Sequence, residues 1–237
     1  MNKRIAIATT LTLVITFALV ANTALGIRIS PRARINPEKL TKITTFDEGC
    51  SGWKYFSIPF DASLSVQDIR ITHNRVIMTL QEAFDSGLML SQIYLRDNEN
   101  PGYQVASSFE TGKAYLCYVL VADDITLSAV GTFDDSNEPI ELFQGWNYIG
   151  ITTQSTIPLS NLRFSLESDV GISLKEPMYD LTFEEASDVL ISSFMFHATN
   201  TDEPVYELFS GDILVPGDVY LVYALHDGVM VSYVPTL

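Results

Sequence analysis

An acidic turn near the middle of the chain is the group of residues best suited to metal chemistry. Its side chains, Asp134, Asp135, Asn137 and Glu138, offer clustered carboxylate and amide oxygens, which are the ligands that calcium prefers. The turn lacks the central glycine and the twelfth-position glutamate of an EF-hand loop. Because Asp and Asn also stabilise turns through their own backbone, an ordinary turn is the alternative interpretation. Calcium is the one cofactor that the sequence suggests.

The only two tryptophans, Trp53 and Trp146, are candidates for binding a sugar. Aromatic ring faces suit the flat faces of pyranose rings, so the pair could form a carbohydrate platform. Each tryptophan follows a glycine and stands among apolar residues, a context that is also typical of a packed core position or of an anchor at a sheet edge. The sequence leaves open whether these residues bind a glycan or have such a structural role.

No pattern in the sequence indicates a catalytic residue. The three histidines, His73, His197 and His226, do not fall in a metalloprotease motif, and neither a nucleophile elbow nor a phosphate-binding loop is present. A glycosidase needs two carboxylates in a cleft, but a chain this acidic always contains a suitable-looking pair. We therefore expect a protein that is not an enzyme, with glycan hydrolysis as the weakest alternative.

The two cysteines, Cys50 and Cys117, could close a disulfide in an exported protein, because oxidising compartments allow disulfides to persist. Cys117 lies in an apolar strand pattern, so a buried free thiol is the alternative. Two cysteines without a nearby histidine do not match a zinc site.

The charge of the chain is distributed very unevenly. From Tyr55 to the end the sequence contains 26 acidic and six basic residues, a net charge of −20. Such a body repels nucleic acid, so no nucleic-acid partner is expected. The segment before it is basic, and the residues that make it so are Arg28, Arg32, Arg34, Lys39 and Lys42. This arm could dock on the acidic body of a neighbouring copy, since complementary fields orient association; a simple spacer is the alternative.

The N-terminus has the features of an export segment. Lys3 and Arg4 precede an uncharged, apolar stretch that extends to Ile27, and Ala24 and Gly26 are the small residues that a signal peptidase reads. The stretch is also long enough to span a bilayer. We predict a cleaved signal peptide over residues 1–26, with an uncleaved anchor or a filament-forming hydrophobic helix as alternatives. The protein is then extracellular or at the cell surface, and it contacts the membrane only through residues 5–26, if these are not cleaved.

Several blocks of the sequence recur in the same order. GWKYFSIPF at 52–60 matches GWNYIGI at 145–151, and TLQEAFDSG at 79–87 matches TFEEASDVL at 182–190. Self-similarity of this kind indicates a repeated structural unit. We expect two pseudo-symmetric copies, a first β repeat over 50–131 and a second over 145–237. A basic connector over 27–49 precedes the first repeat, and a link over 132–144 joins the two.

The composition and periodicity of each repeat predict a mainly β fold with short helices. Apolar runs at 114–121 and 219–225 are typical of central strands covered on both faces, and each follows a glycine turn. Thr79 with Glu82, and Thr182 with Glu185, have the spacing of a capping box at the start of a helix. The repeated carboxylates are thus explained without catalysis.

Two short patterns resemble a module of bacterial and archaeal cell-surface and secreted multidomain proteins. A Gly-Lys-x-Tyr sequence opens residues 112–131, which end in a glycine, and Leu-x-x-Gly-Trp-Asn occupies 142–147. The resemblance covers most of residues 50–235, although Asp218 stands where the second copy would have the lysine. It implies a surface-exposed structural or recognition role without an agreed enzymatic activity.

Together these features predict a non-enzymatic cell-surface protein with a structural, assembly or attachment role. Its expected partners are other surface proteins or copies of itself. The alternatives are a carbohydrate-binding module and a subunit of an extracellular filament anchored by its N-terminal helix.

Overall fold

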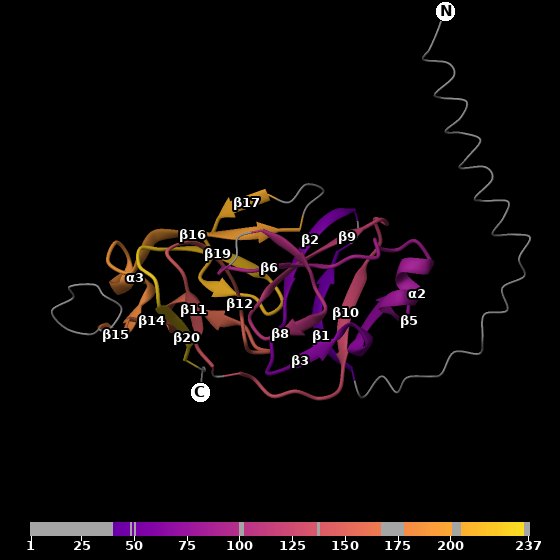
Figure 1. The fold of residues 1–237 in the computed structure, drawn as a ribbon, viewed down its shortest axis with the longest axis horizontal. Helices are drawn as coiled ribbons and strands as arrows, with labels where there is room; N and C mark the ends of the chain where they lie inside the picture. Colours follow the sequence, from indigo (N-terminus) through magenta and orange to yellow (C-terminus); the bar gives the residue numbers. More distant parts are fainter. Residues whose placement is uncertain are drawn as a thin grey trace, which may run out of the picture. The chain divides into compact units, whose positions relative to one another are not determined.

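The described part of the chain folds almost entirely into antiparallel β-sheets joined by turns (Figure 1). The structure is a computed structural model that describes residues 40–47, 49, 51–99, 102–136, 138–166, 178–200 and 205–234. For residues 178 and 179 it describes the backbone alone. The predicted fold class, mainly β with short helices, is confirmed.

The first half of the described chain, residues 40–130, forms two four-stranded sheets and one short strand pair. One sheet has the order β1 (Leu40–Phe46), β10 (Ile125–Val130), β4 (Ile69–His73) and β5 (Val76–Thr79). The other has the order β2 (Gly52–Ser57), β9 (Ala114–Val119), β6 (Tyr94–Arg96) and β7 (Tyr103–Val105). The pair is β3 (Ser63–Ser65) with β8 (Ser108–Glu110), and the helices are α2 (Leu80–Asp85) and a 3-10 turn, Val66–Asp68.

The second half, residues 140–233, contains corresponding elements. One sheet has the order β11 (Ile140–Leu142), β20 (Val229–Tyr233), β14 (Leu162–Leu166) and β15 (Met178–Thr182). The other has the order β12 (Gly145–Gly150), β19 (Val219–Ala224), β16 (Ile191–Thr199) and β17 (Val205–Leu208). The pair is β13 (Ile157–Pro158) with β18 (Ile213–Leu214), and the helices are α3 (Phe183–Ala186) and a 3-10 turn, Leu159–Asn161.

The two halves therefore have the same strand order in each of their sheets. Trp53 and Trp146 are both the second residue of their strands, β2 and β12, and Tyr115 and Tyr220 are both the second residue of β9 and β19. These are the positions at which the predicted repeats were expected to coincide.

Each half has its own hydrophobic core between its two four-stranded sheets. In the first half, Ile71 of β4 and Leu127 of β10 belong to the same buried cluster as Phe56 of β2. In the second half, Phe164 of β14 and Val231 of β20 join Val222 of β19. We call the sheet that contains β2 and the sheet that contains β12 the inner sheets. Because side chains alternate along a strand, each inner sheet has a second face that points away from its core. The candidate site lies on these second faces.

The two predicted capping boxes are present. Thr79 accepts a hydrogen bond from the Glu82 backbone N–H while the Glu82 carboxylate accepts from the Thr79 backbone N–H, and Thr182 and Glu185 repeat this exchange at α3. These hydrogen bonds also lower the pKa of the Glu185 carboxyl. The central strands are confirmed as well, since β9 and β19 are buried on both faces apart from one partly exposed residue each.

The structure differs from the sequence prediction at both linking segments. Residues 40–46 of the predicted 27–49 connector form β1, which pairs with β10, so Lys42 is a strand residue and not part of a free arm. Residues 140–142 of the predicted 132–144 link form β11, which pairs with β20. Both are edge strands whose partners lie far along the chain, and β11 has only three residues.

The N-terminal predictions fall on residues that the structure does not describe. Residues 1–26 and the arm residues Arg28, Arg32, Arg34 and Lys39 lie outside the described ranges. Within those ranges, no helix combines the length and the apolar character needed to cross a bilayer.

Candidate binding surface

A large aromatic surface lies on the two inner sheets, on the side turned away from both cores. Residues that pair directly across antiparallel strands share a face, and such pairs connect Trp53 to Tyr118 and Trp146 to Tyr223. We call this surface the aromatic face. Its larger side chains are Trp53, Tyr55, Tyr94, Arg96, Tyr103, Val105, Leu116, Tyr118, Trp146, Tyr148, Phe194, Phe196, Tyr206, Leu208, Leu221 and Tyr223.

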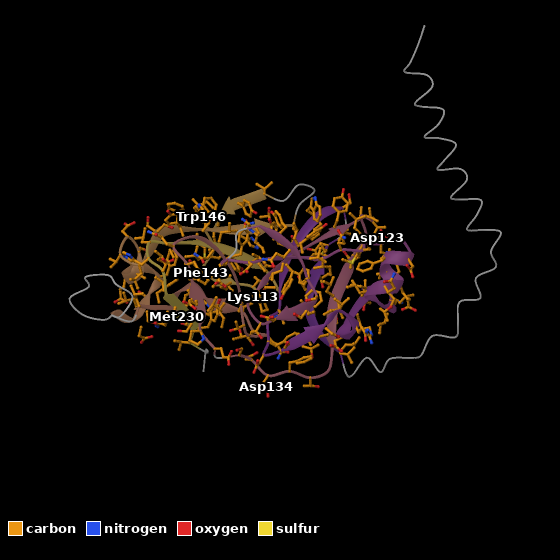
Figure 2. The ribbon with its side chains drawn as sticks, in the orientation of Figure 1. Lys113, Asp123, Asp134, Phe143, Trp146 and Met230 are labelled. Atoms are coloured by element: carbon orange, nitrogen blue, oxygen red, sulfur yellow. The ribbon has the colours of Figure 1, made fainter. Side chains whose placement is uncertain are left out.

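Among the described residues of its strands, the aromatic face has one charged side chain, Arg96, and no aspartate or glutamate, although the chain has 29 acidic residues. Much of it is open to solvent: Trp146 is 45% exposed, Tyr103 54% and Leu208 60%. Figure 2 places Trp146 on the upper side of the view, with the strands β16 and β17 of Figure 1. Exposed apolar patches of this kind mark interaction sites on soluble proteins.

The two halves meet at the centre of the aromatic face through a pair of asparagine clamps. Asn98 Nδ2 donates to the Tyr148 carbonyl at 3.0 Å, and Asn98 Oδ1 accepts from the Tyr148 N–H at 2.7 Å. In the opposite direction, Asn200 makes the same two bonds to Tyr55, at 2.9 and 2.7 Å. Because β2 and β12 are edge strands, each side-chain amide takes the place of a neighbouring strand.

Four tyrosines and one arginine fill the centre between these clamps. The rings of Tyr55 and Tyr148 stack at 5.9 Å, and the Tyr206 hydroxyl lies 2.6 Å from that of Tyr55 and 2.9 Å from that of Tyr148. The Arg96 guanidinium lies 5.0 Å from the ring centres of Tyr103 and of Tyr148. Cation–π contact therefore holds the single positive charge of the face in place.

Two of the central phenols, Tyr55 and Tyr206, have a raised pKa. Burial, with further contributions from hydrogen bonds to Tyr103 and Tyr206, raises the pKa of the Tyr55 hydroxyl above its usual value. Burial also raises the pKa of Tyr206. The centre of the face combines hydroxyl donors and acceptors with one cation, an arrangement suited to holding two halves together and to recognising a ligand.

A hollow of about 380 Å³ opens in the first-half part of the aromatic face. Its lining residues are Trp53, Tyr55, Tyr94, Tyr103 and Leu116. It is mainly apolar, with phenolic hydroxyls as its polar groups, which is the general composition of small-molecule sites.

The two tryptophans are more exposed than residues of a packed core. Trp146 is exposed, and Trp53 is partly buried beside the hollow. Their described aromatic neighbours stand at 50° to 90° to them, so no parallel ring covers either indole. Trp146 is therefore not a fully buried core residue, while an edge-anchor role and sugar binding both stay predictions.

Two of the candidate calcium ligands, Asp134 and Asp135, hold their loop against distant parts of the chain, and calcium binding stays a prediction. Asp135 Oδ1 accepts a hydrogen bond from the Gln154 N–H at 2.7 Å, and the Asp134 carbonyl accepts one from the Asp61 N–H at 2.8 Å. Asn137 lies outside the described residues, and the described part of the chain holds no group of three or more His, Cys, Asp or Glu side chains that could bind a metal. Figure 2 shows Asp134 on the lower side of the view, away from Trp146.

Two of the three histidines, His73 and His197, pair with carboxylates at strand ends. His197 Nε2 lies 3.0 Å from Asp218 Oδ2, and the His197 ring stacks on Tyr220 at 5.1 Å. His73 Nε2 lies 3.0 Å from Asp123 Oδ2. Each pair joins a strand to a neighbouring turn or strand, so a structural role accounts for both.

Cys117 is a free thiol in the core of the first half, and its partner across β2 is Lys54. Cys50 lies outside the described residues, so the predicted Cys50–Cys117 disulfide has no support. Burial raises the pKa of the Cys117 thiol even though the nearby Lys54 acts in the opposite direction.

Cys117 should therefore resist alkylation in the folded protein. We expect iodoacetamide at about pH 8.5, near the usual thiol pKa, to leave Cys117 unmodified and to label it fully in denaturant, because both exposure and thiolate are required. Peptide mass mapping scores Cys117 separately from Cys50. Rapid labelling of Cys117 under native conditions would contradict its burial.

Comparison with known proteins found no matching family model, no matching curated protein and no matching solved structure. The similarity to the Gly-Trp-Asn surface module therefore stays a resemblance. The candidate site has to be judged on its own geometry.

The sequence predicted Trp53 and Trp146 as candidates but not the face around them. Its pattern is present in the sequence: aromatic residues at every second position in 53–55, 146–148 and 194–196. Alternation shows that such residues share a side of a strand, but not whether that side meets a core or solvent.

Proposed function

We propose that this protein is a non-enzymatic, exported surface protein that attaches to its partner through the aromatic face. The observation that carries the proposal is the exposure of Trp146, Tyr103 and Leu208 on one continuous surface of an otherwise acidic chain. Trp and Tyr are enriched at recognition surfaces because they offer large contact areas with few rotatable bonds.

The division into two halves supports the same role. The equal strand orders and the paired asparagine clamps favour an internal duplication, with each half presenting one inner sheet to the shared face. Hydrogen bonds between the two halves would fix the orientation of one inner sheet relative to the other. A rigid surface loses little conformational entropy when it binds.

Export is supported by the sequence alone. Residues 5–26 form an apolar segment behind two basic residues. The intact mass of the native protein distinguishes the alternatives, since a start near Ile27 indicates cleavage and retention of Met1 indicates an anchor. Recovery of the protein in the cytosol would contradict both.

The attachment proposal predicts that Leu208→Ser combined with Trp146→Ala reduces binding to isolated envelopes of the producing cells by about tenfold or more. The two changes remove exposed apolar area from the face, and tenfold corresponds to about 1.4 kcal/mol. The readout is the amount of purified full chain that sediments with the envelopes. Circular dichroism confirms that the variant is folded.

Ile213→Ser is the matched control, because Ile213 is 54% exposed but lies in β18, outside the aromatic face. It should bind as the unchanged protein does. Equal losses in both variants would contradict a role for the face.

A third variant with Arg28, Arg32 and Arg34 changed to Gln tests the basic arm, since light scattering would reveal lost self-association if the arm docks on acidic bodies.

A further inference from the structure

We propose that the hollow beside Trp53 binds one ring of a neutral glycan. The inference rests on the proposed attachment function and assigns it a ligand class. It follows from the shape of the hollow, the orientation of its rings, the position of its hydroxyls and the absence of acid from its lining.

The Trp53 ring lines the hollow, and among the described residues its aromatic neighbours are edge-to-face and none is a parallel partner. Tyr94 lies 5.9 Å away at 60°, and Tyr118 lies 5.1 Å away at 90°. Elsewhere in the chain rings do stack in parallel, as Tyr55 does on Tyr148. The position next to Trp53 therefore suits the flat, C–H-bearing face of a sugar ring, which is attracted by the negative face of the indole.

Phenolic hydroxyls supply the polar contacts that a sugar needs. The Tyr94 hydroxyl donates to Gln92 Oε1 at 2.6 Å, so its oxygen can still accept from a ligand. The Tyr103 hydroxyl, 3.3 Å from that of Tyr55, belongs to a residue that is 54% exposed. Few polar groups at the edge of an apolar pocket orient a ligand without preventing its desolvation.

The charged residues in and around the hollow make it unsuited to glycoside hydrolysis and to the binding of anionic sugars. None of the five lining residues is an aspartate or glutamate, whereas glycoside hydrolysis generally uses two carboxylates. The one cation of the face, Arg96, is engaged with the rings of Tyr103 and Tyr148. With a net charge of −20 after Lys54, the surrounding body repels polyanions, so a neutral glycan fits best.

The second half provides a matched comparison. Trp146 has the same place in β12, but Phe196 stands where the first half has Tyr94, since these residues pair with Leu221 and Leu116 at corresponding positions of β19 and β9. Phe194 adds a further ring 6.1 Å from Trp146. The second half thus lacks the hydroxyl of Tyr94, and Trp146 should not bind the sugar.

The chain has two tryptophans, so single-tryptophan variants report on each half separately. Full-length Trp146→Phe, in which Trp53 is the only tryptophan, should show a saturable change in selectively excited tryptophan fluorescence with cellohexaose or chitohexaose. Trp53→Phe, in which Trp146 is the only tryptophan, should show little change. By calorimetry, Trp53→Ala should weaken binding about tenfold or more, and Tyr94→Phe several-fold. Hexagalacturonate should bind more weakly than the neutral hexamers.

Three results would overturn the glycan site. These are no calorimetric binding of either neutral hexamer, unchanged affinity in folded Trp53→Phe and Trp53→Ala, or a response confined to Trp146. If light scattering instead shows dimers that Trp53→Ala dissociates, the hollow serves a second copy and the inference fails. Competition by an excess of the soluble neutral hexamer that binds separates this inference from the proposed function. Attachment that this hexamer does not reduce but that needs Trp146 and Leu208 would refute the glycan and retain the face.

Discussion

Gly150→Ala is expected to destabilise the protein by about 3 kcal/mol and to lower its Tm by about 6–12 °C, a large effect for a single added methyl group. Gly150 ends β12 at the junction, and its N–H donates to the Gly112 carbonyl at 3.0 Å. A Cβ at this position would overlap Cβ and Oγ of Ser57, the corresponding last residue of β2. Only one of these two facing positions has room for a side chain.

The clash of the added Cβ can also be relieved by removing the Ser57 side chain, and this change provides the decisive test. The double variant Ser57→Gly with Gly150→Ala should recover most of the lost stability in chemical denaturation, because the methyl group then enters the space left by Ser57. Recovery will be incomplete, since Ser57 Oγ also donates to the Asp218 carbonyl at 2.9 Å. The pair should therefore show strong coupling in a double-mutant cycle.

Gly211→Ala is the control for a glycine with ordinary backbone angles. It is exposed, and its added Cβ would approach only the ring of Phe209. Its expected effect is below about 0.5 kcal/mol, as for most surface substitutions. If Gly150→Ala were as mild as Gly211→Ala, the halves would not meet as closely as described.

Asn98→Ala and Asn200→Ala are each expected to cost about 2 kcal/mol in the free energy of unfolding. Each change removes two hydrogen bonds to backbone groups of Tyr148 or Tyr55, which are 8% and 2% exposed and therefore shielded from water. Unsatisfied buried groups cost about 1–3 kcal/mol, partly offset where water reaches them.

A conservative change from Asn to Asp distinguishes the contributions of the two hydrogen bonds in a clamp. Asn200→Asp keeps an acceptor for the Tyr55 N–H but loses the donor to the Tyr55 carbonyl, so an intermediate loss of stability is expected. In the double alanine variant, denaturation should change from one transition to two, because the halves have separate cores. Unchanged midpoints in both single variants would show that the clamps are not stabilising.

The sequence by itself determined the local structure where neighbouring residues decide it. Thr79 and Glu82 form a capping box because the two side chains lie one helical turn apart, and Thr182 and Glu185 repeat it for the same reason. The runs that became β9 and β19 are apolar on both faces, which suits only a central, covered strand. Gly112 and Gly217 adopt positive φ angles at the turns where this was expected.

Tertiary structure alone decided what the strands face and which residues meet. The sequence predicts a connector where the structure has the edge strand β1, because its pairing with β10 joins residues as distant as Leu40 and Val130. The strand β11 escapes prediction for the same reason, since its partner β20 lies near the other end of the chain. Lys54, not Cys50, is opposite Cys117, a consequence of the register between β2 and β9.

The aromatic face shows the same limit most clearly. Alternation places Trp53 with Tyr55, and Trp146 with Tyr148, on one side of a strand, but the sequence does not reveal whether that side is covered. Tyr55 meets Tyr206 and Asn200 only because the two halves pack edge to edge, with 151 and 145 positions between these residues in the chain. Contacts at such separations depend on the relative placement of complete sheets, and local residue preferences carry no information about it.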